Sequence, residues 1–196
     1  MVLEVLRQPL EDGEVHISRV NATMSYPAKI MLIAAMNPCP CGYRTDPAKA
    51  CTCSDSDIRR YVKKISGPLL DRIDLHVHVP RPEYGELASS QINESSAAIA
   101  CRVEEARAVQ VLRLSEFGIA CNAHMRHRHI RATCHLTEAA QNILQRAFAK
   151  MNLSARSYDR IIKVARTVAD LSHSSDIDAV HIAEAISFRN NVQVNQ

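Results

Sequence analysis

The sequence of 196 residues contains no tryptophan, and aromatic residues make up only 4% of it. Hydrophobic residues nevertheless make up 46%, so we expect a core built from alanine, isoleucine, leucine and valine. No run of about 18 apolar residues occurs, which predicts no transmembrane helix and no membrane partner. Glu4 and Arg7 interrupt the apolar residues at the N-terminus, as in an amphipathic helix and unlike a signal peptide. A cytoplasmic location is therefore expected.

A strong charge of either sign is also lacking. The chain has 24 lysines and arginines against 21 acidic residues, a net charge of +3, which does not by itself indicate nucleic-acid binding. One stretch is locally basic, and its basic residues are His124, Arg126, His127, Arg128, His129 and Arg131. This stretch could contact nucleic-acid phosphates, or it could be a solvated connector.

Two apolar segments predict strands. Residues 29–36 form a run that is too short for a typical helix, and Asn37 follows it directly, so we expect a strand buried on both faces of a parallel sheet. Residues 73–79 alternate apolar and polar side chains and predict a second strand. A hairpin is expected over residues 14–27. So few strands cannot form a complete sheet covered on both faces, which predicts an incomplete parallel sheet in an α/β remnant.

The character of the sequence changes near residue 85. From there to the C-terminus, apolar residues recur at helical spacing in four successive segments, which predicts an all-helical bundle. A capping-box pattern at Ser175 to Asp178 precedes the fourth segment. We therefore expect two domains: residues 1–85, which contain a Cys-rich insertion at 38–56, and residues 86–196, which are helical.

Four of the seven cysteines form a cluster in the sequence. They are Cys39, Cys41, Cys51 and Cys53. Without a signal peptide, such a cluster favours a metal over disulfides. Four thiolates satisfy tetrahedral Zn²⁺ and leave no open position, so the predicted zinc is structural and not catalytic. The C-x-C spacing is less usual for zinc than C-x-x-C, and free thiols, a redox pair or a site that is only sometimes filled are the alternatives.

Three polar residues lie where they could contact a phosphate. Asn37 follows a predicted strand, where ligands of open sheets bind. Arg72 precedes the second strand, and its guanidinium could stabilise charge on a phosphoryl group bound to a neighbouring subunit. Arg156 lies in the first turn of a helix that Ser154 could cap, where a bound anion would offset its unfavourable interaction with the helix dipole. The ordinary alternatives are a turn, a surface salt bridge and a solvated arginine.

Several motifs together resemble the ComM/YifB branch of the Mg-chelatase-related AAA+ ATPases. The match covers nearly the whole chain, in order. The segments that carry it are LEVLRQPLEDG at 3–13, NPCPCGY at 37–43, SGPLLDRID at 66–74, LSARSYDR at 153–160 and VARTVADL at 164–171. The resemblance implies that the chain corresponds to the C-terminal part of such an ATPase, with the end of the α/β core followed by a helical lid.

The resemblance also implies roles for individual residues. Asn37 matches sensor 1, which positions the attacking water, Arg72 matches the arginine finger, which acts on ATP in the adjacent protomer, and Arg156 matches sensor 2. The hairpin at 14–27 would face the central pore of a ring oligomer, a hexamer. ATP and Mg²⁺ would be the cofactors of the longer protein. Its partner would be DNA, processed by a helicase-like branch migration during natural transformation.

The sequence departs from the family at the primary nucleotide site. It contains no G-x-x-x-x-G-K-[ST] loop (Walker A) and no apolar strand ending in Asp-Glu (Walker B), so we expect this chain alone to hydrolyse no ATP. Two other interpretations stay open. The chain could be a standalone, zinc-stabilised helical module that binds nucleic acid or protein, or a subunit for metal insertion into a porphyrin. The Cys-rich insertion after Asn37 favours the ComM branch over the chelatase branch, by resemblance only.

Overall fold

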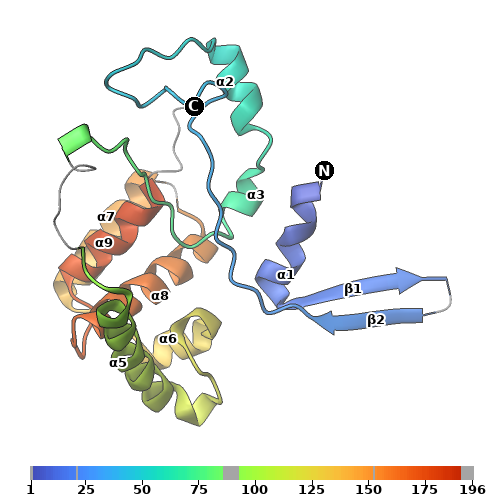
Figure 1. Cartoon of the computed structure of the whole chain (residues 1–196). Coiled ribbons are helices and arrows are strands. Elements are labelled where there is room, and N and C mark those ends of the chain that lie inside the picture. The colour runs from blue at the N-terminus through green and yellow to red at the C-terminus, as the bar shows by residue number, and fades with distance from the viewer. Residues whose placement is uncertain (1, 21, 86–92, 152, 191–196) are drawn as a thin grey trace. The chain divides into compact units, whose positions relative to one another are not determined.

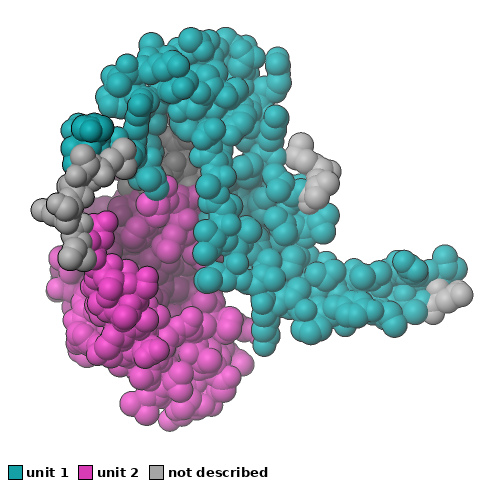
Figure 2. Space-filling view, in the orientation of Figure 1, with its two compact units in different colours: residues 1–73, 78–87 teal, residues 74–77, 88–196 magenta. Residues whose placement is uncertain are grey.

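The computed structural model describes residues 2–20, 22–85, 93–151 and 153–190. The chain folds as two compact units (Figures 1 and 2), which are residues 1–73 with 78–87, here the N-terminal unit, and residues 74–77 with 88–196, here the helical unit. The domain boundary predicted between residues 85 and 86 adjoins residues 86–92, which lie outside the described residues. No helix in the described part of the chain is long and apolar enough to cross a membrane.

The N-terminal unit contains short elements joined by long connections. Its elements are η1 (Val2–Leu6), α1 (Arg7–Asp12), β1 (Glu14–Arg19), β2 (Ala22–Pro27), α2 (Asp55–Val62) and α3 (Gly67–Leu70). Helix α1 ends at Gly13, whose φ of 69° is left-handed and whose N–H donates to the Pro9 carbonyl. Helices α2 and α3 each begin after a serine N-cap. The hydroxyls of Ser54 and Ser66 each accept a hydrogen bond from the backbone N–H three residues later.

The hairpin predicted for residues 14–27 is confirmed. Strands β1 and β2 pair antiparallel, from Glu14 opposite Pro27 to Arg19 opposite Ala22. The register places the pairs Val15–Tyr26 and Ile17–Met24 on one face, since side chains alternate along a strand. Ile17, Met24 and Tyr26 are each about half exposed. The hairpin therefore carries an apolar face that is only partly covered by the N-terminal unit.

The two strands predicted from apolar patterning do not form in the described residues. Residues 29–36 and 73–79 have no strand partner there, and the sheet consists of β1 and β2. Their apolar side chains lie at the surface, with Ile33 83% and Val79 80% exposed. The predictions of a buried parallel strand at residues 29–36 and of an alternating strand at residues 73–79 were therefore wrong for the described residues. Local patterning shows that a segment suits a sheet, but pairing also needs neighbouring strands. The broader expectation of a small α/β remnant followed by a helical domain holds.

The helical unit holds most of the buried apolar residues. Its elements are α5 (Ser96–Leu114), η2 (Ser115–Phe117), η3 (Asn122–His124), α6 (His127–Thr133), α7 (Glu138–Met151), α8 (Ala155–Leu171) and α9 (Ala179–Asn190). Helix α8 packs against α5, α6 and α9, so it is the central element. The core is aliphatic, as composition predicted, and its largest members are Leu114, Met125, Ile130, Leu144, Ile161, Ile162, Ile177, Ile182 and Ile186.

A buried ion-pair network joins the helices of this unit. Arg166 is fully buried and Asp170 is 2% exposed, and Arg166 Nε donates to Asp170 Oδ1 over 3.0 Å. Arg113 of α5 binds both oxygens of the same carboxylate, each over 2.7 Å. Asn122 of η3 donates to Asp170 Oδ2 over 2.8 Å, and Arg166 Nη1 donates to the Ser175 carbonyl over 2.7 Å. One carboxylate therefore connects α5, η3, α8 and, through Arg166, the loop before α9.

Replacing Asp170 with alanine would leave two arginines of this network without their carboxylate. We expect Asp170→Ala to lower the free energy of unfolding of the helical unit by about 3–5 kcal/mol, the usual effect of breaking a buried pair. Urea denaturation followed by circular dichroism measures it. Asp176→Ala is the matched control, because Asp176 is exposed in the loop before α9, and it should change stability by less than about 0.5 kcal/mol. Equal effects of the two substitutions would contradict the assignment.

Candidate metal centre and phosphate-contacting residues

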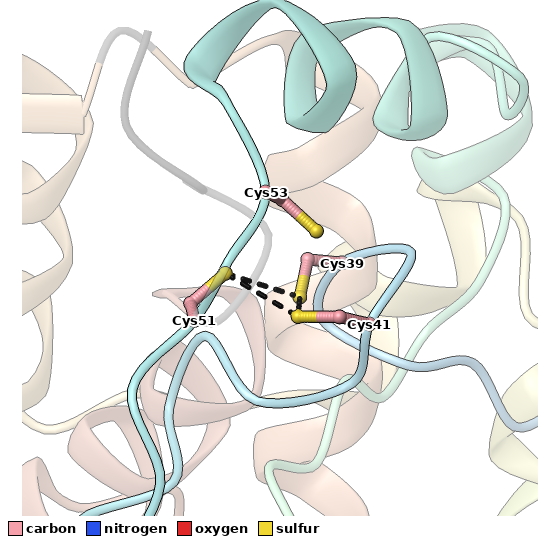
Figure 3. A group of neighbouring side chains, drawn as sticks. All are labelled: Cys39, Cys41, Cys51 and Cys53. Carbon is pink, nitrogen blue, oxygen red and sulfur yellow. Dashed lines mark hydrogen bonds between the residues drawn. The ribbon is translucent and has the colours of Figure 1, made fainter.

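The four clustered cysteines converge on one point (Figure 3). One sulfur from each of Cys39, Cys41, Cys51 and Cys53 lies within 4.8 Å of the others. The Sγ atoms of Cys39 and Cys41 are 3.3 Å apart. The Sγ atom of Cys51 lies 3.6 Å from that of Cys39 and 3.5 Å from that of Cys41. A tetrahedral zinc with Zn–S bonds of about 2.3 Å needs sulfurs about 3.8 Å apart. The spacing therefore fits one zinc ion with small adjustments.

The local chain explains how two C-x-C pairs can share one ion. Gly42, with a φ of +83°, closes a tight turn in which its N–H donates to the Cys39 carbonyl over 3.1 Å. The residues between the paired cysteines, Pro40 and Thr52, are both exposed, so the sulfurs on either side of them point inward. Cys53 directly precedes the start of α2. The turn and the helix start thus compensate for the unusual one-residue spacing.

The protons on these thiols are distributed unevenly. Backbone hydrogen bonds from Tyr43 and then Thr52 lower the pKa of Cys41 to about 5. Burial, together with the neighbouring sulfurs, raises the pKa of Cys53 to about 12. Clustered thiolates repel one another, so the four thiols cannot all ionise unless a cation replaces their protons. A divalent metal that binds soft thiolates supplies that charge.

Arg72 is held within the N-terminal unit. Its Nη1 donates to the Pro68 carbonyl over 2.7 Å, and its side chain is 13% exposed. Its Nε lies 2.9 Å from Glu11 Oε2, but outside hydrogen-bonding geometry, so the contact is an ion pair. The ordinary alternative from the sequence was a surface salt bridge with Asp71 or Asp74, whereas the ion pair in the structure is with Glu11, 61 residues away, and the arginine is largely buried. No local sequence signal points to Glu11.

Asn37 and Arg156 lie at exposed positions in different units. Asn37 directly precedes the turn of the cysteine cluster, with its side chain near Gly42. Arg156 lies in the first turn of α8, where Ser154 accepts a hydrogen bond from the Ser157 N–H over 3.2 Å and is the predicted cap. The residues predicted as phosphate contacts are therefore divided, with Asn37 and Arg72 in the N-terminal unit and Arg156 in the helical unit.

A cavity that sequence reasoning missed adjoins Arg156. It has a volume of about 490 Å³ and is lined by His127, Phe148, Ala155, Arg156, Tyr158 and Asp159. His127 Nδ1 lies 2.8 Å from Asp159 Oδ1, and the rings of Phe148 and Tyr158 meet edge to face with centroids 6.4 Å apart. These residues come from α6, α7 and α8, so only the fold brings them together. The cavity combines the guanidinium of Arg156, which has no ion-pair partner among the described residues, with an apolar wall.

Comparison with known proteins identifies the family. The family model "Magnesium chelatase, subunit ChlI" matches residues 1–87, and the model of its C-terminal domain matches residues 93–189. The chain therefore belongs to the magnesium chelatase-related family, as the sequence motifs indicated. Within this family it is similar to ComM and YifB proteins, and it matches the C-terminal part of ComM.

Three curated relatives show how far the similarity extends. The chain is 40% identical to Competence protein ComM of Haemophilus influenzae over its whole length, and 38% identical to YifB of Escherichia coli over 95% of its length. An uncharacterised protein of Mycobacterium tuberculosis is also 38% identical over 95% of the chain. The chain spans only 37%, 36% and 37% of the length of these relatives, respectively.

The cysteine cluster predicts a stoichiometric metal content. Protein produced without added metal should contain about one zinc ion per chain by elemental analysis, because four converging thiolates form a complete tetrahedral site. Cys41→Ser and Cys51→Ser should each reduce the zinc content to well below half. Cys101→Ser is the matched control, since Cys101 is exposed on α5 and outside the cluster. A folded, metal-free wild-type chain would sink the zinc assignment.

Proposed function

We propose that this chain is part of an ATP-hydrolysing AAA+ motor, in which Asn37, Arg72 and Arg156 act on ATP and Mg²⁺ bound by another part of the longer protein. Two observations support the proposal. The chain belongs to the magnesium chelatase-related family, and contacts within the N-terminal unit hold Arg72 in place. Asn37 positions the attacking water as sensor 1. Arg72 acts as the arginine finger of the adjacent subunit, and Arg156 contacts the phosphates as sensor 2.

The contacts of Arg72 suit an arginine finger. Its link to the Pro68 carbonyl fixes one end of the guanidinium, while its ion pair with Glu11 lacks hydrogen-bond geometry. A phosphoryl group, which carries more charge than one carboxylate, can compete with Glu11 for the guanidinium. Such a fixed cation stabilises charge in the transition state without reorganising at the moment of reaction.

Arg156 has what a phosphate contact needs. It is exposed beside the 490 Å³ cavity and forms no ion pair with the residues that the structure describes. The N-terminus of the 17-residue helix α8 adds a favourable potential for an anion at the same place. An anion bound there would balance the positive charge of Arg156 and the positive end of the helix dipole.

The proposed zinc supports this site from a distance. Its four ligands would close the loop between Asn37 and α2, which has little apolar burial of its own. The ion would be structural, because all four positions are occupied by cysteine. Its effect is to fix the turn that begins two residues after Asn37.

The partners of the longer protein are proposed from its relatives. One of them is a competence protein, so we propose a cytoplasmic, hexameric ring that processes DNA during natural transformation, including helicase-like branch migration. The hairpin β1–β2 would face the pore, and its half-exposed Ile17, Met24 and Tyr26 would be available there. The second candidate is a standalone zinc-stabilised module that binds nucleic acid or protein, which the separate core of the helical unit favours.

The chain alone should show no ATPase activity. It has no phosphate-binding loop in its sequence, so ATP would find neither a backbone cradle nor the loop lysine. Phosphate release by the purified chain should equal the buffer background. Turnover that survives a mock purification from cells lacking the gene would overturn this expectation.

The role of Arg72 can be tested in the longer protein. If the coding sequence upstream of Met1 contains an in-frame phosphate loop, Arg72→Ala should reduce ATP turnover by about 10³-fold or more, because an arginine finger is lost. Arg59→Ala, on the exposed side of α2, should have little effect. Mixing the Arg72→Ala protein with a variant lacking the loop lysine should restore partial activity, since the finger acts across subunits. No recovery in the mixture contradicts that role.

A further inference from the structure

The region around α6 forms a strongly basic surface. From residue 117 to residue 137 the sequence has no aspartate or glutamate, but three arginines and four histidines. Arg126, Arg128 and Arg131 are all exposed on this part of the helical unit and are here called the α6 arginines. None of the three forms a salt bridge with a residue in the described ranges, so their charge is not balanced within the unit.

The α6 arginines are presented by a rigid element. Ile130 and His129 of α6 are each 3% exposed, and α6 packs on the central helix α8. The Arg126 N–H donates to His129 Nδ1 over 2.9 Å, and the Phe117 ring lies 5.0 Å from that imidazole. Because the buried side of the helix is anchored, little conformational entropy of the backbone is lost when the arginines bind a partner.

The charges around α6 repel one another. Burial lowers the pKa of His129, and the nearby cations Arg128, Arg126 and Lys163 lower it further, in that order. Lys163 is anchored at the same place, since its Nζ donates to the Ala123 carbonyl over 3.0 Å. The neighbouring carboxylate of Asp159 is already paired with His127. A polyanion laid over this surface would relieve the repulsion and release its own counterions.

The side chains available near α6 indicate which polyanion fits. The aromatic rings beside α6 are packed against other rings, since Phe117 lies against His129 and Phe148 meets Tyr158 edge to face. A duplex, whose bases are already stacked, needs no free ring as a stacking platform. Three arginines on one short helix match phosphates, whereas reading bases needs an element inserted in a groove. We propose that the α6 arginines bind the phosphate backbone of double-stranded DNA without regard to base sequence. This inference deepens the proposed DNA role and uses none of the ATP-contacting residues.

Matched charge variants test the surface. Binding of the 196-residue chain to a fluorescent duplex is measured by anisotropy between about 50 and 200 mM salt, without ATP. Arg126→Gln with Arg131→Gln should weaken binding about 10- to 100-fold and reduce the slope of log K against log salt by about 1.8, for two lost contacts. Arg107→Gln with Arg146→Gln, exposed on α5 and α7, removes the same net charge and should leave the slope unchanged. Arg126→Lys with Arg131→Lys should retain the slope.

The outcomes separate this surface from the wider proposal. If the two double glutamine variants lose the same DNA affinity, the effect is one of net charge and the inference is overturned. The inference is also overturned if neither variant loses affinity. Tighter binding of a single strand than of a duplex would also overturn it. Thermal melts by circular dichroism confirm that each variant is folded. If the α6 variants bind normally while the chain still binds DNA, this surface is wrong and the DNA role stands. The Arg72 mixing experiment remains an independent test of the ATPase.

Discussion

The helical unit depends on one buried carboxylate. Asp170 is approached by Arg166, Arg113 and Asn122, which belong to α8, α5 and η3. Apolar contacts in an aliphatic core are not directional, whereas the hydrogen bonds of this network depend on the relative positions of the helices that carry them. Ion pairs of this kind often add little net stability, because removing charges from water is costly. We therefore assign the network to the specificity of the helix arrangement, including the position of α8, which carries Arg156 at its other end.

The N-terminal unit is organised by different means. Few of its apolar residues are buried in the described part, and the largest of them are Ile58 and Leu69. Its order comes from serine caps, a left-handed glycine after α1 and the cysteine turn, all of which are local. A small unit with a thin core usually needs a metal or a disulfide to hold its loops, and the four converging sulfurs are arranged so that they could hold a metal. The exposed residues 29–36 fit a unit that completes its sheet with additional strands.

Sequence reasoning succeeded where the decisive interactions are local. Helical periodicity predicted the long helices, alternation predicted the hairpin, and the clustering of cysteines in the sequence predicted that their four sulfurs converge. It failed for residues 29–36 and 73–79, because strand pairing depends on distant partners. It also missed α6, whose seven residues show too little apolar periodicity, and the Glu11 partner of Arg72. In the capping pattern before α9, the residue that accepts the Ala179 N–H is Asp178, which needed the structure to identify.

The chain enters the helical unit shortly after Arg72. Residues 74–77 belong to the helical unit by their contacts, although they follow Arg72 closely in the sequence. Asp74 lies 3.8 Å from Arg160 of α8, and the His76 N–H donates to the Phe188 carbonyl over 2.9 Å. Only Ile73 separates Arg72 from this anchored segment. Because these contacts hold residues 74–77 in the helical unit, the chain passes from one unit to the other directly after Ile73.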